Sequence, residues 1–263
     1  MTLQLSDLYN GGLRALDSAT KYPSIPTYHP IEMSARGKGR LLEENPISFT
    51  GTTYAHEKVD GSNARIVVLP KNSGWLIGSR DEILTAQGDL VASPSLRIVE
   101  ALAELAGRIE NRASSYILTA YLEVYGDRRT PAWAAYGDGK GVAARLFDVS
   151  YVPVDVLDLP IDNIASWRDH GGQDWLEDEV VTKYADRHGL ERVPLLFEIP
   201  GHSLPRTIDD MYELLQPYRT TRAGISGTPG QAEGIVLTSS DRLTRAKVRF
   251  RDYERTIRLR EAA

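Results

Sequence analysis

Alternation of hydrophobic and polar residues dominates the middle and the end of the chain. Within residues 63–69, Ala64, Ile66 and Val68 recur at every second position, which is the period of a strand with one buried face. The segment 142–152 is apolar almost throughout, which predicts a strand buried on both faces. The predicted strands are 52–58, 63–69, 75–80, 116–125, 142–152, 233–238 and 245–251.

Helical spacing is found in shorter segments between these strands. A cap and a proline at Ser93–Pro94 predict a helix start, and apolar residues then recur at intervals of three and four up to Asn111. A second helix is predicted over 174–188, and a third is predicted to follow a cap at Thr207. Together these patterns predict an α+β fold, with antiparallel sheets flanked by helices.

Composition places the chain among globular proteins and excludes some kinds of site. Of the 263 residues, 41% are hydrophobic and 25% are charged, as in ordinary soluble domains. No apolar run approaches the length that spans a bilayer, so we expect no membrane contact. The chain has no cysteine, which excludes disulfides and thiolate metal sites and is compatible with a reducing cytoplasm. The spacing of the five histidines does not predict a zinc site.

Charge is distributed unevenly along the chain. The net charge of −5 argues against a nonspecific coat of nucleic acid. The segment 241–260 is nevertheless strongly basic, which suits a local phosphate site better than a general grip on a polyanion. Its cations are Arg242, Arg245, Lys247, Arg249, Arg251, Arg255, Arg258 and Arg260.

Candidate chemistry centres on the octet His-Glu-Lys-Val-Asp-Gly-Ser-Asn at 56–63. Its Lys-x-Asp-Gly core resembles the nucleophile motif of the covalent nucleotidyltransferases, which are the ATP-dependent DNA and RNA ligases and the mRNA capping enzymes. An amine attacks phosphorus only when it is unprotonated, so neighbouring positive charge would favour attack by Lys58. The carboxylate of Asp60 offers hard oxygens to a hydrated magnesium ion. The alternative is a simple hairpin with Asp60-Gly61 as its turn.

Five further segments match motifs of the same superfamily in the same order. The set spans residues 56–251, which makes it far more specific than any one member. The segments are Ser79-Arg80, Tyr121-Leu122-Glu123-Val124-Tyr125-Gly126, Leu146-Phe147-Asp148-Val149, Glu233-Gly234-Ile235-Val236-Leu237 and Lys247-Val248-Arg249.

The resemblance implies a role for several of these side chains. Arg80 would contact a nucleotide or RNA phosphate, for which a planar guanidinium is suited. Glu123 would bind the ribose hydroxyls, and the ring of Phe147 would stack on the purine. Glu233 would organise a magnesium ion together with Asp60.

The remaining implied contacts involve residues near the lysine and in the last strand. Glu57 is expected to contact adenine, although a surface charge at a strand end is an equal alternative. Asn63, two residues after the motif glycine, is expected in the nucleotide site. Alternation puts Lys247, Arg249 and Arg251 on one strand face, where repulsion between cations predicts bound anions. Lys247 would hold the α-phosphate and lower the pKa of Lys58 by like-charge proximity, and Arg249 is expected to bind the nucleotide beside it.

Each motif also has an ordinary structural interpretation. Arg80 can be a surface arginine at a strand end, and Glu123 can lie on the wet face of a half-exposed strand. Most phenylalanines in strands, such as Phe147, are core residues. The 233–237 segment can be a plain strand, and the last basic strand can be a charged sheet edge that prevents aggregation.

Two departures from the ligase and capping pattern narrow the resemblance. DNA ligases and capping enzymes carry Asp-Gly-Glu at the ribose motif, whereas this chain has Tyr121-Leu122-Glu123. The segment 248–263 is also too short for their C-terminal OB-fold domain. The chain therefore resembles the RNA ligase 2-like family of phages, bacteria and kinetoplastid editing complexes. We expect a single nucleotidyltransferase domain over 1–263, in the cytoplasm of a bacterium or a phage-infected cell.

The resemblance implies an ATP-dependent RNA ligase with Mg²⁺ or Mn²⁺ as cofactor. Lys58 would carry AMP covalently, the AMP would move to a 5′-phosphate RNA end, and a 3′-hydroxyl end would displace it. RNA would contact residues 1–50, the segment 251–260 or an accessory RNA-binding protein. The alternatives are a DNA ligase or capping-type nucleotidyltransferase acting with a separate OB-fold protein, and a non-catalytic module that binds nucleotide or RNA ends.

Overall fold

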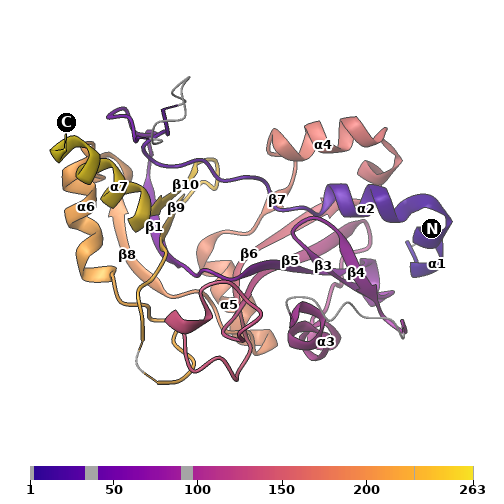
Figure 1. The fold of residues 1–263 in the computed structure, drawn as a ribbon. Coiled ribbons are helices and arrows are strands. Elements are labelled where there is room, and N and C mark those ends of the chain that lie inside the picture. Colours follow the sequence, from indigo (N-terminus) through magenta and orange to yellow (C-terminus); the bar gives the residue numbers. More distant parts are fainter. Residues whose placement is uncertain (1–2, 33–40, 90–96, 228, 263) are drawn as a thin grey trace. The chain divides into compact units, whose positions relative to one another are not determined.

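A computed structural model describes residues 3–32, 41–89, 97–227 and 229–262. The chain divides into two compact units (Figure 1). Because the boundary falls between Asp60 and Gly61, it cuts through the predicted nucleophile motif. Unit 1 comprises Met1–Ser24, Gly61–Ala134 and Asp138–Arg192, and unit 2 comprises Ile25–Asp60, Ala135–Gly137 and Val193–Ala263.

Unit 1 is built on a six-stranded antiparallel sheet with the strand order β4-β3-β2-β5-β6-β7. Strands β2 and β5 lie at its centre, and their side chains alternate between two buried surfaces. The strands are β2 (Ser62–Val68), β3 (Trp75–Ser79), β4 (Ile83–Ala86), β5 (Tyr116–Tyr125), β6 (Ala143–Pro153) and β7 (Asp174–Trp175).

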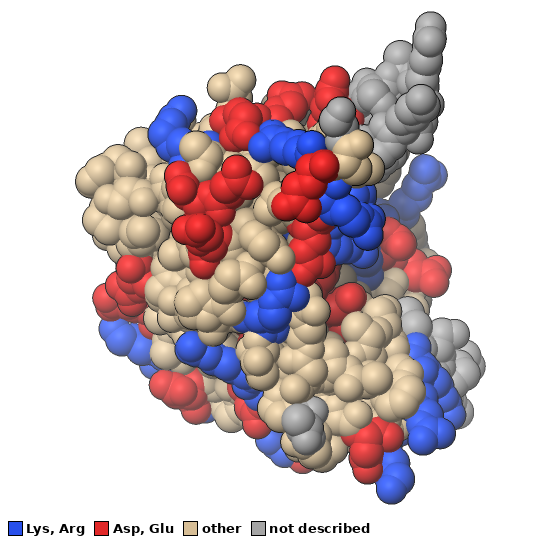
Figure 2. Space-filling view, turned by 60° about the vertical axis from the view of Figure 1, so that its left-hand side comes forward, with Lys and Arg blue, Asp and Glu red and all other residues tan. Residues whose placement is uncertain are grey.

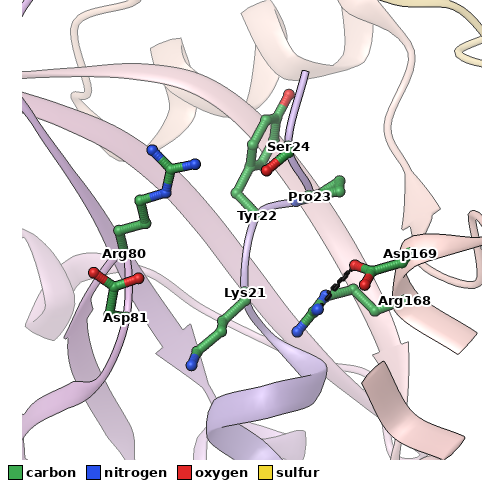
Figure 3. Close-up of a pocket in the computed structure, with 8 residues that line it drawn as sticks. All are labelled: Lys21, Tyr22, Pro23, Ser24, Arg80, Asp81, Arg168 and Asp169. Carbon is green, nitrogen blue, oxygen red and sulfur yellow. Dashed lines mark hydrogen bonds and ion pairs between the residues drawn. The ribbon is translucent and has the colours of Figure 1, made fainter. Parts of the chain in front are cut away.

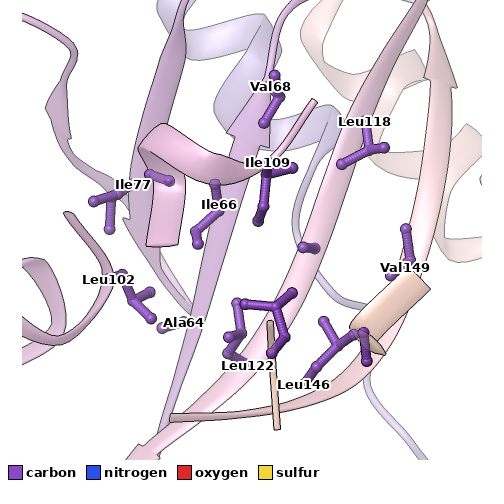
Figure 4. Close-up of a cluster of buried hydrophobic side chains, with 14 of the residues drawn as sticks. Ala64, Ile66, Val68, Ile77, Leu102, Ile109, Leu118, Leu122, Leu146 and Val149 are labelled. Atoms are coloured by element: carbon purple, nitrogen blue, oxygen red, sulfur yellow. The ribbon is translucent and has the colours of Figure 1, made fainter. Parts of the chain in front are cut away.

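Helices cover both faces of the unit 1 sheet. Leu102 of α3 and Val181 of α5 belong to the core on one face, with Ile66 and Leu122 (Figure 4). The second core, on the other face, includes side chains from α2 and α4. The helices are α1 (Leu5–Asp7), α2 (Leu13–Ala19), α3 (Ile98–Arg108), α4 (Ile161–Asp169) and α5 (Asp178–His188), with a π-helical turn at Leu8–Gly12 between α1 and α2.

Unit 2 is built on a four-stranded antiparallel sheet with the order β10-β9-β1-β8. One face packs on α6 and α7 through Met211 and Phe250, among others. Its elements are β1 (Thr52–Lys58), β8 (Leu195–Pro200), α6 (Ile208–Leu215), β9 (Gly234–Ser239), β10 (Arg245–Arg249) and α7 (Phe250–Glu261). Short 3-10 turns in the two units lie at Pro70–Asn72, Trp133–Ala135, Val154–Asp158, Gly201–Ser203 and Gln216–Tyr218.

The predicted α+β class with antiparallel sheets is confirmed, and so are most predicted strands. The cap at Thr207 is also confirmed, because its hydroxyl accepts a hydrogen bond from the Asp210 amide. The helix predicted over 174–188 is wrong at its start, because Asp174–Trp175 pairs with β6. The strand predicted to reach Arg251 is also too long, since the chain becomes helical at Phe250.

One predicted feature, the helix start at Ser93–Pro94, lies outside the described residues. The single nucleotidyltransferase domain over 1–263 stays a prediction. Among the described helices, none has the length and apolar character needed to cross a membrane.

Candidate functional site

The predicted nucleophile lies on one face of the unit 2 sheet together with the cations of the last strand. Lys58 is paired with Gly234 across β1 and β9, and Gly234 is paired with Arg249 across β9 and β10. Lys247 is two residues before Arg249, so it shares the same face. We call this set, Lys58, Lys247 and Arg249, the lysine face. The opposite face of the same strands contributes to the hydrophobic core of unit 2.

The Lys58 amine forms an ion pair with Glu233, the residue that precedes β9. The side chains are 27% and 10% exposed, so the pair is largely shielded from water. The group that contacts the Lys58 amine is therefore a carboxylate, whereas the sequence indicated neighbouring cations.

Gly234 lets β10 approach β9 at this point. A Cβ atom on Gly234 would lie 1.9 Å from the Val248 carbonyl oxygen and 2.8 Å from the Arg249 Cα atom. No side chain fits such a space, so the glycine is required by the neighbouring strand. Lys58 and Arg249 therefore flank Gly234 from the two strands on either side of β9.

Glu57 lies on the opposite side of β1 from Lys58, as period-two alternation requires. Its side chain is buried, and its two carboxylate oxygens accept hydrogen bonds from the Thr221 hydroxyl and from the Arg222 amide, the latter at 2.7 Å. The structure therefore gives Glu57 a clear structural role, which is to fix the segment at 221–222.

The two predicted phosphate-binding cations differ in their surroundings. The Arg249 guanidinium donates to the buried Asp252 carboxylate at 2.7 Å, an ion pair between the end of β10 and the first turn of α7. Lys247 is held through its backbone, which exchanges hydrogen bonds with Pro26 and Tyr28. Arg251 lies on α7 and not on β10, so the prediction that it shares the strand face of Lys247 and Arg249 is wrong.

The predicted metal ligands Asp60 and Glu233 both belong to unit 2 and are both partly exposed. Burial first, and then the negative charges of Glu57, Asp60 and Glu233, raise the pKa of the Tyr136 hydroxyl. Oxygen donors of this kind suit Mg²⁺, which keeps several waters and needs few protein ligands. The donor set therefore fits the ion, although the described residues contain no group of three or more potential ligands.

Unit 1 carries the predicted purine-stacking residue within an aromatic cluster. The ring of Tyr22 stands nearly perpendicular to Phe147, with 5.0 Å between the ring centroids, and lies 5.2 Å from Trp175. The Tyr22 hydroxyl donates to the Asp148 carboxylate at 2.9 Å. Tyr22 comes from the extended segment after α2 and is part of no predicted motif. Its separation of more than a hundred residues from Phe147 explains why sequence spacing missed it.

Glu123 lies in a row of polar residues that crosses the unit 1 sheet. It is paired with Asn63 on β2 and with Arg145 on β6. Its carboxylate accepts a hydrogen bond from the Gly61 amide at 3.1 Å. A Cβ atom on Gly61 would lie 2.5 Å from the Val124 carbonyl oxygen, so the motif glycine packs directly on β5. The predicted ribose ligand and the predicted residue Asn63 are therefore neighbours.

Tyr121, which faces the aromatic cluster, is supported by buried polar groups. Burial raises the pKa of Tyr121 to about 12, so its hydroxyl is neutral. The Gln173 amide donates to this hydroxyl at 2.8 Å, and Ser150 lies within hydrogen-bond distance. The fully buried Arg65 forms an ion pair with Asp17. These contacts fix the sheet surface beside Phe147, and no sequence motif signals them.

Arg80 lines a cavity of about 280 Å³ in unit 1 (Figure 3). Lys21 and Arg168 are the other cations at its wall, and Tyr22 connects it to the aromatic cluster. Arg168 is paired with Asp169 at 2.8 Å. The cavity walls are Lys21, Tyr22, Pro23, Ser24, Arg80, Asp81, Arg168 and Asp169.

Comparison with known families decides the assignment that these motifs suggest. The RNA ligase family matches residues 51–251, which is most of the chain. The protein belongs to the RNA ligase family. Comparison of this RNA ligase family member with curated proteins finds no match.

Solved structures of Naegleria gruberi RNA ligase share the fold of this family member. A lysine-to-alanine mutant with ATP and Mn is 12% identical, with a TM-score of 0.54 over 88% of this chain and 63% of that chain. An aspartate-to-alanine mutant, apo, is 12% identical, with a TM-score of 0.53 over 91% of this chain and 64% of that chain. The structure with PPi is 12% identical, with a TM-score of 0.52 over 88% and 64%. The chain thus spans less than two thirds of the length of these chains.

In this RNA ligase family member, the predicted site residues fall into two groups. Unit 2 holds Lys58, Asp60, Glu233, Lys247 and Arg249, and Glu57 on the core side of its sheet. Unit 1 holds Asn63, Arg80, Glu123 and Phe147. Within each group the motifs come from distant parts of the sequence and meet on one sheet.

Proposed function

We propose that the protein is an ATP-dependent RNA ligase that joins a 3′-hydroxyl and a 5′-phosphate RNA end. The reaction proceeds through AMP bound covalently to Lys58 and through an adenylylated RNA end. One observation carries the proposal: Lys58, Glu233, Lys247 and Arg249, from three separate motifs, meet at one sheet of unit 2.

The lysine face supplies groups for nucleotidyl transfer. The amine of Lys58 forms a bond to the α-phosphorus of ATP while the bond to pyrophosphate breaks, and the amine loses a proton. Glu233 contacts this amine and is the group in place to accept that proton. Lys247 and Arg249 offer positive charge to the phosphates, and positioning and charge neutralisation provide most of the acceleration in such reactions.

Two further transfers complete the reaction. An oxygen of the RNA 5′-phosphate displaces Lys58 from the AMP phosphorus, and the lysine nitrogen regains a proton. The 3′-hydroxyl then attacks the 5′-phosphate, loses its proton, and expels AMP. Both steps leave Lys58 as it began, so one amine serves repeated cycles.

The unit 1 residues are assigned to the nucleoside. Phe147 stacks on adenine, because any aromatic ring offers a face to a purine. Tyr22 stands against Phe147 and supports that ring. Glu123 accepts hydrogen bonds from ribose hydroxyls, and Asn63 lies beside it on the sheet.

Asp60 and Glu233 are the proposed ligands of Mg²⁺ or Mn²⁺. When bound, such an ion neutralises phosphate charge and favours departure of pyrophosphate. ATP and Mn are named with the similar Naegleria gruberi structures, which supports the use of a nucleotide and a divalent ion.

We propose that RNA contacts the protein at local basic sites. Acidic and basic side chains are intermixed on the face that carries α6 and α7 (Figure 2), so a sequence-independent coat is not favoured. The cavity beside Arg80 is lined by three cations together with two carboxylates, and its Arg80 guanidinium would contact a backbone phosphate. On α7, Arg251, Arg255 and Arg258 are spaced four and three residues apart, which places them on one helix face. Residues 1–50 or an accessory RNA-binding protein would add further contacts.

The test is a sealing assay of four reactions, which combine two nicked duplexes with two nucleotides. Nicked RNA and DNA duplexes with a 5′-phosphate and a 3′-hydroxyl are each incubated with Mg²⁺ and either ATP or GTP. The proposal predicts joined RNA with ATP and an adenylylated 5′ end as an intermediate. Joining only of DNA, use of GTP in place of ATP, or ATP binding without pyrophosphate release would each contradict it.

A further inference from the structure

A three-residue piece of the β5–β6 connection is built into unit 2. Ala135–Gly137 belongs to unit 2, although the residues on both sides of it belong to unit 1. The Gly230 amide donates to the Ala135 carbonyl at 2.8 Å, and the Ile225 amide donates to the Tyr136 carbonyl at 2.7 Å. A Cβ atom on Gly230 would lie 2.7 Å from the Ala135 Cα atom. These backbone contacts hold Ala135–Gly137 in place independently of the Tyr136 side chain.

That piece carries a fully buried tyrosine. The Asp60 amide donates to the Tyr136 hydroxyl at 2.6 Å. Asp60 is two residues beyond Lys58, where β1 has already ended. The hydroxyl therefore holds the backbone next to the nucleophile at a point that the sheet no longer fixes.

We propose that Tyr136 is the positioning residue of the nucleophile segment. Its hydroxyl fixes the Asp60 amide, and through it the direction in which Lys58 and the Asp60 carboxylate leave the strand. The inference rests on the proposed adenylylation of Lys58 and adds a residue that none of the motifs contains. Lysine–AMP formation depends on this hydrogen bond because small displacements of a reacting group are costly.

The experiment compares Tyr136→Phe with Tyr253→Phe. Tyr253 is a matched control, because it is also buried in unit 2 and its hydroxyl lies 2.6 Å from His29 Nδ1. Hydrogen exchange followed by mass spectrometry measures the peptide that contains Asp60. The rate of lysine–AMP formation is measured against ATP concentration for the same proteins.

For Tyr136→Phe we expect faster exchange of the Asp60 peptide only. At saturating ATP, the rate of lysine–AMP formation should fall roughly 10-fold, the effect of losing one hydrogen bond from the reacting arrangement, while KM for ATP stays within about twofold of wild type. Tyr253→Phe should leave both measurements at wild-type values.

Three results overturn the proposal. One is unchanged exchange of the Asp60 peptide in Tyr136→Phe. Another is faster exchange with an unchanged rate of lysine–AMP formation. The third is equal loss of protection throughout unit 2, which would make the tyrosine a general packing residue. If the wild type forms no lysine–AMP but Tyr136→Phe still shows faster exchange of the Asp60 peptide, the proposed function fails. The hydrogen bond between Tyr136 and Asp60 would still be supported.

Discussion

Replacing Glu57 by glutamine distinguishes between two roles for the residue before Lys58, an adenine contact and a structural contact. The sequence motif suggests an adenine contact, whereas the structure buries this carboxylate on the core side of β1. There it accepts from the Thr221 hydroxyl and the Arg222 amide. We expect Glu57→Gln to lower stability and to leave KM for ATP near its wild-type value.

The magnitude follows from the two hydrogen bonds. Each bond to a buried charged acceptor contributes about 1.5–3 kcal/mol. Glutamine keeps one acceptor oxygen, which can serve the Arg222 amide, but it presents an NH₂ group to the Thr221 hydroxyl. The net loss is therefore on the order of 2 kcal/mol, which lowers Tm by about 4–8 °C in a chain of this size.

The assay combines thermal unfolding with the ATP dependence of lysine–AMP formation. Glu198→Gln is the control, because Glu198 is an exposed glutamate on β8 of the same sheet, and exposed substitutions usually stay within about 0.5 kcal/mol. A Tm equal to wild type together with a tenfold rise in KM for ATP would refute the structural role and support the adenine contact.

Three further outcomes follow from individual contacts. Gly234→Ala should destabilise the protein by about 3 kcal/mol or more, because its Cβ would meet the Val248 carbonyl at 1.9 Å; a wild-type Tm would contradict this. Tyr22→Phe removes the 2.9 Å hydrogen bond to Asp148 but keeps the ring, so KM for ATP should rise roughly fivefold, and an unchanged KM would exclude a role beside the purine. Burial lowers the pKa of His29, so the unfolded chain binds its proton first and stability falls as pH drops below about 6.5. His29→Gln should lose less stability than wild type between pH 7 and pH 5.5 in urea unfolding, and equal losses would contradict the assignment.

The strands of both sheets could be predicted because their alternation is strong and local. Ala64, Ile66 and Val68 recur at every second position, and all three are buried in one core. The same rule places Lys247 and Arg249 on one face, and it also puts Glu57 on the opposite face from Lys58. The two-residue alternation of the strand therefore predicts correctly that Glu57 points away from Lys58, although the motif resemblance suggested a contact with adenine.

Other features could not be predicted from local patterns. In α7, the apolar residues Phe250, Tyr253 and Ile257 recur at helical spacing, but the surrounding arginines favoured the interpretation of a charged strand face up to Arg251. The contacts of Tyr22 and Tyr136 join residues far apart in the chain, and no spacing rule predicts them. The Glu233 ion pair shows the same limit, since the sequence indicated cations near Lys58 but not which side chain would contact it.

The central claim is that the amine of Lys58 accepts AMP from ATP. The most direct measurement incubates the protein with Mg²⁺ and ATP labelled at the α-phosphorus, then maps the label by peptide mass spectrometry. We expect label on Lys58 in the wild type and in Lys183→Ala, an exposed lysine on α5, and none in Lys58→Ala. Label that persists in Lys58→Ala, label on a different lysine, or an unlabelled wild type would contradict the account.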